Sequence, residues 1–164
     1  MTAVFSSCRT WRYRLERVWD AALPRVAFIL LNPSTADETN DDPTIRRCIG
    51  YARAWGMGSL VLGNIFAYRS TSPFALREVC DPIGPDNDQH LAEIAVASSI
   101  VVCGWGAHGR LHQRDRRVVE LIAEAGGRPH ALRLTNGGEP GHPLYLRKDL
   151  QPRPYTMPRE GFTR

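Results

Sequence analysis

Short apolar runs recur along the chain at residues 25–31, 59–68, 99–104 and 129–134, and each has about the length of one strand. Because apolar and polar residues do not alternate regularly within them, these runs are typical of strands buried on both faces of a sheet. Residues 9–19 differ, since Trp11, Tyr13 and Leu15 alternate with polar positions. That alternation predicts an antiparallel or edge strand.

Amphipathic segments lie between these runs, at residues 43–56, 87–98 and 114–127. The first has an apolar stripe at helical spacing, begins at a proline and ends at a glycine, as helices commonly do. Strands that alternate with helices of this length predict an α/β fold. We expect a three-layer α/β/α sandwich with a mainly parallel central sheet.

The chain has 164 residues, enough for one domain with a single core. We expect one α/β domain over residues 1–150 and a loosely attached tail over the proline-rich residues 151–164. No apolar run reaches the roughly 20 residues of a membrane helix, and the N-terminus lacks the apolar segment of a signal peptide. The sequence therefore predicts a cytoplasmic protein without a membrane partner.

The basic residues are almost all arginines: the formal charge is +4, and Lys148 is the single lysine. Arginine binds phosphate and stacks on bases better than lysine does, which favours a nucleic acid, such as DNA, or a nucleotide as partner. The codon preference of a GC-rich genome would produce the same bias. Composition alone leaves both explanations open.

The four cysteines, Cys8, Cys48, Cys80 and Cys103, are widely spaced and form no C-x-x-C pair. We expect reduced thiols that pack as small hydrophobic groups, with an iron–sulfur cluster of scattered ligands as the alternative. The histidines have no zinc-motif spacing. The sequence therefore predicts neither a metal nor a cofactor.

Polar residues follow the apolar runs in four segments, at residues 30–37, 63–73, 103–109 and 135–146. In open α/β sheets, ligands bind in the crevice at the carboxyl ends of the strands. If these segments occupy equivalent strand ends, they converge on one rim. We expect the functional site there.

The first of these segments contains Asn32, Pro33 and Ser34 directly after an apolar run. Asn32 offers an acceptor and two donors at a position that Pro33 stiffens, although a simple turn cap is the alternative. Asp37, Asp41 and Asp42 are candidates for a general base or a metal site. Asp41 and Asp42 are better explained as acids that stabilise the start of the helix at Pro43.

The other segments add further candidates. Asn64 and Arg69 follow the second apolar run, and the Arg69 side chain suits a phosphate or carboxylate, or else a surface ion pair. Gly104 permits close approach of a ligand to the backbone, or simply a tight turn. His142 precedes a proline in a glycine-rich loop, where its imidazole is suited to stabilise a developing anion or to transfer a proton.

The block "ILLNPSTADETNDDPTIRRCIGYARAWG", with "NIFAYRSTSPFAL" and "PIGPDND", resembles the uncharacterised bacterial and phage domain family numbered 1643. The similarity extends from about Tyr13 to Leu150. The family's name implies no function.

The order of the segments also resembles the uracil-DNA glycosylase superfamily. The similarity rests on "LLNPS", "NIFAYRSTSP", "VVCGWGA" and "GHPLYL", although Leu30 and Leu31 replace the glycine of the first motif and no serine follows Pro143. This resemblance implies a glycosylase-like fold. It also implies a water held by Asn32 and a base oxygen contacted by His142.

By this resemblance the chemistry would be cleavage of the N-glycosidic bond of a base in DNA. Asp37 would activate the water, and Tyr145 or Leu144 would fill the gap that the extruded base leaves. Phosphates would be held by Arg69 and by a basic segment consisting of Arg110, Arg114, Arg116 and Arg117. A hydrolase or transferase acting on a free nucleoside or nucleotide, and a non-catalytic nucleic-acid or nucleotide binding module, are the alternatives.

Overall fold

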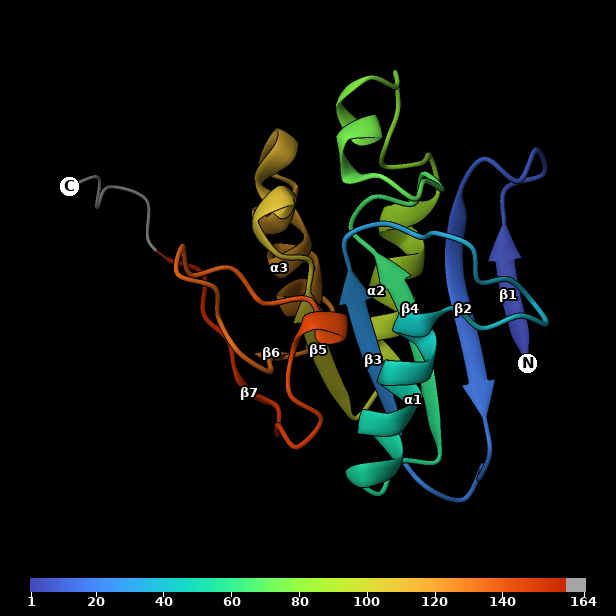
Figure 1. Ribbon diagram of the computed structural model, residues 1–164, viewed down its shortest axis with the longest axis vertical. Coiled ribbons are helices and arrows are strands. Elements are labelled where there is room, and N and C mark those ends of the chain that lie inside the picture. Colours follow the sequence, from blue (N-terminus) through green and yellow to red (C-terminus); the bar gives the residue numbers. More distant parts are fainter. Residues whose placement is uncertain (159–164) are drawn as a thin grey trace.

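The computed structural model describes residues 1–158, and within them the strands form one seven-stranded sheet (Figure 1). The spatial order is β1-β2-β4-β3-β5-β6-β7. The strands are β1 (Thr2–Phe5), β2 (Arg12–Val18), β3 (Arg25–Leu30), β4 (Ser59–Asn64), β5 (Ile100–Gly104), β6 (Pro129–Ala131) and β7 (Arg153–Pro154). The helices are α1 (Pro43–Ala54), α2 (Asn87–Val96) and α3 (Arg114–Glu124), with short 3₁₀ helices η1 (Pro73–Arg77), η2 (Ala107–Gln113) and η3 (Pro143–Tyr145).

The centre of the sheet is parallel and its edges are antiparallel. Strand β3 pairs in parallel with both β4 and β5, and β5 pairs in parallel with β6. Strands β1 and β2 on one side and β7 on the other run antiparallel to their neighbours. The α/β class predicted from the alternation of apolar runs and amphipathic segments is confirmed.

Strand β3 supplies side chains to both layers of the core, which explains its unbroken apolar sequence. Val26 and Phe28 pack on the face covered by α1, together with Ile45. Ala27 and Ile29 pack on the opposite face, which α2 and α3 cover. Successive side chains of a strand point to opposite faces, so a strand between two helical layers needs apolar residues at every position. Figure 1 shows α1 in front of the sheet and the other two helices behind it.

The connections that follow β3 and β5 diverge. The chain leaves β3 for α1 on one face and leaves β5 for α3 on the other, and these two strands are neighbours. Such a reversal opens a crevice beyond the carboxyl ends of the two strands. The topology therefore places a potential binding site directly after Leu30 and Gly104.

The two ends of the described chain pair with the sheet in ways that the sequence did not predict. Strand β1 pairs with β2, and β7 pairs with β6. Tyr155 is 6% exposed, and its ring packs edge-on against Trp105. The segment from Gln151 to Pro158 is therefore not the loose tail that we expected, because a core aromatic residue anchors it. The rest of the predicted tail, residues 159–164, lies outside the described residues.

The cysteines do not come together. Cys48 and Cys103 are buried in the core, whereas Cys8 and Cys80 are exposed. Within residues 1–158, no three histidine, cysteine, aspartate or glutamate residues cluster as metal ligands would. The helices of this part of the chain include none that is long and apolar enough to cross a bilayer.

Candidate functional site

A pocket of about 600 Å³ lies beyond the carboxyl ends of β3 and β5. Its walls are residues from the segments 31–35, 42–44, 70–73, 105–108 and 141–146, together with Thr135. Asn32, Ser34, His142 and Tyr145 line it, as the sequence predicted. Two segments that lie more than 100 residues apart in the chain thus converge at the switch point of the sheet.

The amide of Asn32 is held in one orientation. Its Nδ2 donates hydrogen bonds to the carbonyl oxygens of Pro33, at 3.2 Å, and of Ser70, at 2.9 Å. Carbonyl oxygens only accept, so the nitrogen must face them and Oδ1 must face the other way. Oδ1 accepts no hydrogen bond from residues 1–158. Asn32 therefore presents a fixed acceptor that suits a water molecule or a substrate donor.

The imidazole of His142 is held in a defined protonation state. Its Nδ1 accepts a hydrogen bond from the backbone N–H of Leu144 at 3.2 Å, so the proton of the neutral ring resides on Nε2. Burial lowers the pKa of His142 below its usual 6.5, and the nearby carboxylate of Asp42 opposes this shift. At neutral pH the side chain is thus an uncharged donor through Nε2.

Asp42 supplies a carboxylate at the same pocket. It is the N-cap of α1, where Oδ1 accepts a hydrogen bond from the backbone N–H of Ile45 at 2.9 Å. The predicted role at the helix start is therefore confirmed. Oδ2 has no hydrogen-bond partner in the described part of the chain, and the residue lines the pocket. Asp42 can cap the helix and act on a ligand at the same time.

The lowered pKa of His142 predicts a pH dependence of stability. The unfolded chain takes up this proton near pH 6.5, whereas the folded chain resists it until a lower pH. The free energy of unfolding therefore falls as the pH drops from about 6.5 toward the folded pKa. We expect His142→Asn, which keeps an acceptor for Leu144 N–H but does not titrate, to flatten part of this slope in denaturant titrations between about pH 5 and 7.5. Burial also lowers the pKa of His90, so this residue accounts for part of the pH dependence of stability that remains in the variant. Equal slopes in both proteins would contradict this prediction.

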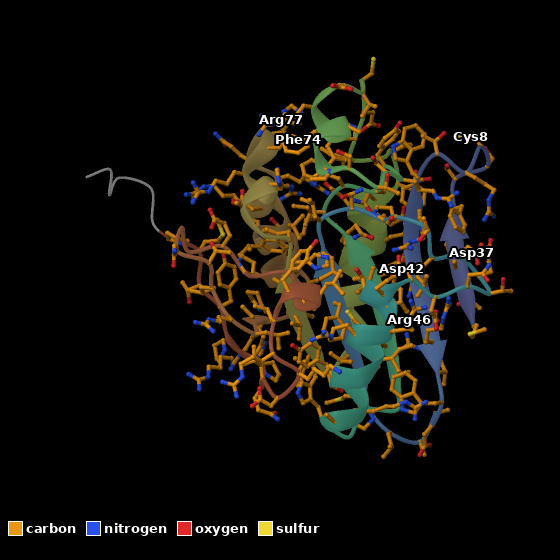
Figure 2. The ribbon with its side chains drawn as sticks, viewed as in Figure 1. Cys8, Asp37, Asp42, Arg46, Phe74 and Arg77 are labelled. Carbon is orange, nitrogen blue, oxygen red and sulfur yellow. The ribbon has the colours of Figure 1, made fainter. Side chains whose placement is uncertain are left out.

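Asp37 does not line the pocket, in contrast to our expectation. Its Oδ1 accepts hydrogen bonds from the backbone N–H groups of Thr39, at 2.9 Å, and Asn40, at 2.8 Å. These bonds lower the pKa of Asp37 to about 2, which makes its carboxylate a poor general base. Figure 2 shows Asp42 at the start of α1 and Asp37 farther toward β1. The contacts of Asp37 are those of a turn-forming residue.

Asn64 and Arg69 also lie outside the residues that line the pocket. Asn64 is 2% exposed, and its Oδ1 accepts a hydrogen bond from Arg12 at 3.3 Å. Arg69 donates to the backbone oxygen of Arg9 and lies over the ring of Phe5, with 4.8 Å between the guanidinium carbon and the ring centroid. Both side chains connect β1 and β2 to the centre of the sheet. The expectation that they line the pocket with Asn32 and His142 is wrong.

Two other predicted site residues, Gly104 and Pro33, position groups that line the pocket. A Cβ on Gly104 would lie 2.9 Å from side-chain atoms of Leu30 and Pro143, so the glycine lets the loop of His142 approach the end of β5. Pro33 is buried and its carbonyl oxygen accepts hydrogen bonds from Asn32 and from the backbone N–H of Ser70. Neither residue lines the pocket, but both fix groups that do.

The arginines of the basic segment, which we expected to hold phosphates, contact other groups of the protein. Arg114 is 3% exposed, donates to the carbonyl oxygen of Ile65 at 2.7 Å and forms an ion pair with Asp88. Arg110 forms an ion pair with Glu139, and Arg117 forms ion pairs with Glu120 and Glu124. Arg116 contacts the backbone oxygen of Pro158. Arg110, Arg114 and Arg117 thus each have an acidic partner within the protein.

Arg114 has a structural role that can be measured. We expect Arg114→Ala to lower the free energy of unfolding by about 2–4 kcal/mol. The substitution removes the shorter of the two hydrogen bonds that the carbonyl oxygen of Ile65 accepts, breaks the ion pair with Asp88 and opens a cavity. Arg117→Ala, on the exposed side of the same helix, is the matched control and should change stability little. Urea denaturation of the two variants compares these effects. Equal losses of unfolding free energy would contradict the prediction, because they would show that the buried contacts of Arg114 contribute no more to stability than the exposed contacts of Arg117.

Three pocket residues are absent from the set that the sequence predicted: Asp42, Trp105 and Ser70. Asp42 was considered as a general base or metal ligand, but its position before Pro43 favoured a role at the helix start. Trp105 directly follows β5 and lines the pocket, although it is 2% exposed. Ser70 contributes its backbone oxygen to Asn32. A backbone contact of this kind leaves no trace in the type of side chain.

Comparison with known families gives one match. Residues 12–144 match the family described as "Protein of unknown function (DUF1643)". No curated protein and no solved structure matches the chain significantly.

Proposed function

The chain belongs to the DUF1643 family, whose description assigns no activity, and we propose that the protein cleaves the N-glycosidic bond of a base in DNA. The observation that carries this proposal is the meeting of three groups in one pocket: the fixed Oδ1 of Asn32, the carboxylate of Asp42 and the uncharged Nε2–H of His142. The sequence resemblance to the uracil-DNA glycosylase superfamily supports the same chemistry.

In the proposed reaction, the bond between C1′ of the sugar and the ring nitrogen of the base breaks, and its electron pair leaves with the base. Negative charge then develops on a base oxygen, where Nε2–H of His142 donates a hydrogen bond. A neutral donor with a lowered pKa suits this role, because it stabilises the anion without needing to be protonated first.

The second half of the reaction is attack by water. The Oδ1 of Asn32 holds the water, and the carboxylate of Asp42 accepts its proton as the oxygen bonds to C1′. The departing base takes up a proton from solvent, so the products are the free base and an abasic sugar. In this assignment the general base is Asp42, which lines the pocket, and not Asp37, which the sequence predicted.

The walls of the pocket suit a flat, largely apolar ring with polar edges. Leu31, Trp105, Leu144 and Tyr145 provide apolar surface, and Ser34 is among the hydroxyl-bearing residues. A volume of about 600 Å³ is within the usual range of small-molecule pockets. A base in duplex DNA would have to leave the stack to enter, at a cost of a few kcal/mol.

A free nucleoside or nucleotide is the second candidate substrate, and binding without turnover is the third possibility. The free-nucleotide candidate is favoured by one observation: Arg110, Arg114 and Arg117, expected to hold a DNA backbone, are paired with acidic residues. Both candidates use the same pocket, so a substrate comparison distinguishes them.

The test is to incubate the protein with single strands and duplexes that carry a panel of modified bases, and in parallel with the corresponding nucleosides, and to detect released base by mass spectrometry. We expect release from the strands and little from the nucleosides. Release from nucleosides alone would support the second candidate, and no release from any of them would refute the proposal. Asp37→Asn, outside the pocket, is the control variant and should retain the activity.

A further inference from the structure

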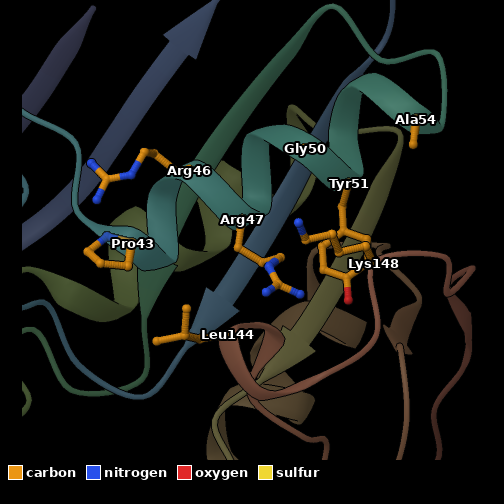
Figure 3. Close-up of a pocket in the computed structure, with 8 residues that line it drawn as sticks. All are labelled: Pro43, Arg46, Arg47, Gly50, Tyr51, Ala54, Leu144 and Lys148. Carbon is orange, nitrogen blue, oxygen red and sulfur yellow. The ribbon is translucent and has the colours of Figure 1, made fainter.

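A second cleft, of about 540 Å³, runs along the exposed side of α1 (Figure 3). Arg46, Arg47, Gly50 and Lys148 are among the residues that line it. Pro43 and Leu144 line both this α1 cleft and the pocket of His142. The two hollows are therefore neighbours on one surface, separated by two apolar side chains.

The α1 cleft is cationic. Arg46, Arg47 and Lys148 contribute positive charge, and no carboxylate side chain is among the described residues that line it. Arg46 donates to the backbone oxygen of Asp41 at 2.9 Å, and Arg47 to that of Leu146 at 2.7 Å. These partners are neutral carbonyl groups, so the hydrogen bonds position the two guanidinium groups without cancelling their charge.

Gly50 is the second unusual feature of the α1 cleft. It lies inside a helix, where glycine is unfavourable, and a Cβ built on it would meet no atom within 4 Å. The packing of the fold thus gives no reason for a glycine at this exposed position. The missing side chain leaves the wall of the cleft open between Arg46, Arg47 and Tyr51.

An aromatic side chain stands at the junction of the two hollows. Tyr145 is 82% exposed, lines the pocket and follows Leu144 directly. Cations that track a phosphate backbone beside an exposed aromatic ring are the features of sites for single-stranded nucleic acid. Arginine is also the side chain best suited to phosphate oxygens.

We infer that the α1 cleft binds the backbone phosphates of a single nucleic-acid strand, next to the nucleotide whose base enters the pocket. The inference deepens the proposed function, since it specifies a strand as the form of the substrate. Arg46, Arg47 and Lys148 hold the phosphates, Gly50 gives them room, and Tyr145 offers a ring on which a neighbouring base stacks. The strand crosses Pro43 and Leu144 between cleft and pocket.

The test is the salt dependence of binding of a fluorescein-labelled single-stranded DNA, followed by anisotropy between about 50 and 200 mM salt. Each phosphate contact contributes about 0.7 to the log–log slope for a single strand. We expect the double variant Arg46→Gln, Lys148→Gln to reduce that slope by about 1.4. Arg47 is not replaced, because it also donates a hydrogen bond to the backbone oxygen of Leu146 and so helps to position that loop.

Gly50 provides a pair of variants that removes no contact of the folded protein. Both Gly50→Gln and Gly50→Glu fill the cleft, and they have nearly the same size. We expect both to weaken strand binding, and Gly50→Glu to weaken it more because it adds a negative charge. Arg117→Gln on α3 is the control and should leave the slope unchanged.

Three outcomes would overturn the inference. The first is a slope in the double variant equal to that of the control. The second is strand binding in both Gly50 variants as tight as in the unmodified protein. The third is equal weakening of a nucleoside monophosphate and of the strand, which would make the ligand a free nucleotide. Binding is measured without turnover, so reduced slopes together with no base release would keep this inference and refute the glycosylase proposal.

Discussion

Replacing His142 with alanine is expected to slow base release about 100- to 1000-fold, the usual effect of removing a donor to a developing anion. Strand binding should change little, because the contact to the base oxygen strengthens only as the bond to C1′ breaks. Release rates by mass spectrometry and affinities by anisotropy measure the two effects separately. A loss of binding that matches the loss of rate would contradict this role.

His142→Asn keeps the interpretation independent of folding. His142 is the N-cap of η3, where it accepts from Leu144 N–H, and an asparagine side chain can make the same contact. It lacks a donor at the position of Nε2. We expect this variant to fold and to be nearly as slow as His142→Ala. A fast His142→Asn protein would show that the cap, and not the donor, is what the reaction needs.

The second large effect is expected at Asp42. Asp42→Asn should slow base release about 100- to 10,000-fold, because an amide does not accept the proton of the attacking water. Asparagine caps helices as well as aspartate does, so α1 should remain intact. Asp37→Asn is the matched control, since it alters a carboxylate in the same segment that does not line the pocket. Loss of activity in Asp37→Asn alone would restore the assignment made from the sequence.

The fold could be predicted to a large extent because its signals are local. An unbroken apolar run such as residues 25–30 fits only a position between two layers, and the structure places β3 there with α1 on one side and α2 on the other. The short outer strands β1 and β7 had no such signal. Their pairing depends on partners distant in sequence and on anchors such as Tyr155.

The location of the pocket could also be predicted, because the carboxyl ends of parallel strands meet at one edge of the sheet. Which of the aspartates lines the pocket could not be predicted. Asp37 and Asp42 lie five positions apart, and their roles are set by where the chain turns and where α1 begins. Asp37 accepts hydrogen bonds from N–H groups of its own turn. Asp42 caps α1 with one carboxylate oxygen and is part of the pocket wall.

The contacts of the arginines that the sequence predicted as phosphate ligands could not be predicted, for a related reason. Sequence patterns show that residues 110–117 are rich in arginine, but not which face of α3 is buried or which acids lie opposite. The structure pairs Arg114 with Asp88 and leaves Arg46, Arg47 and Lys148 lining the α1 cleft. Lys148 reaches the cleft from a segment about 100 residues away, a proximity that only the folded chain reveals.

The most direct test of the proposed function is a single-turnover reaction in ¹⁸O-labelled water with a strand from the panel. The account predicts one ¹⁸O atom on C1′ of the abasic sugar, none in the released base, and formation of both products about 100- to 1000-fold more slowly in His142→Ala. Label in the base would show that water attacks the ring and not the sugar. That result, or the absence of free base from every strand, would contradict the account.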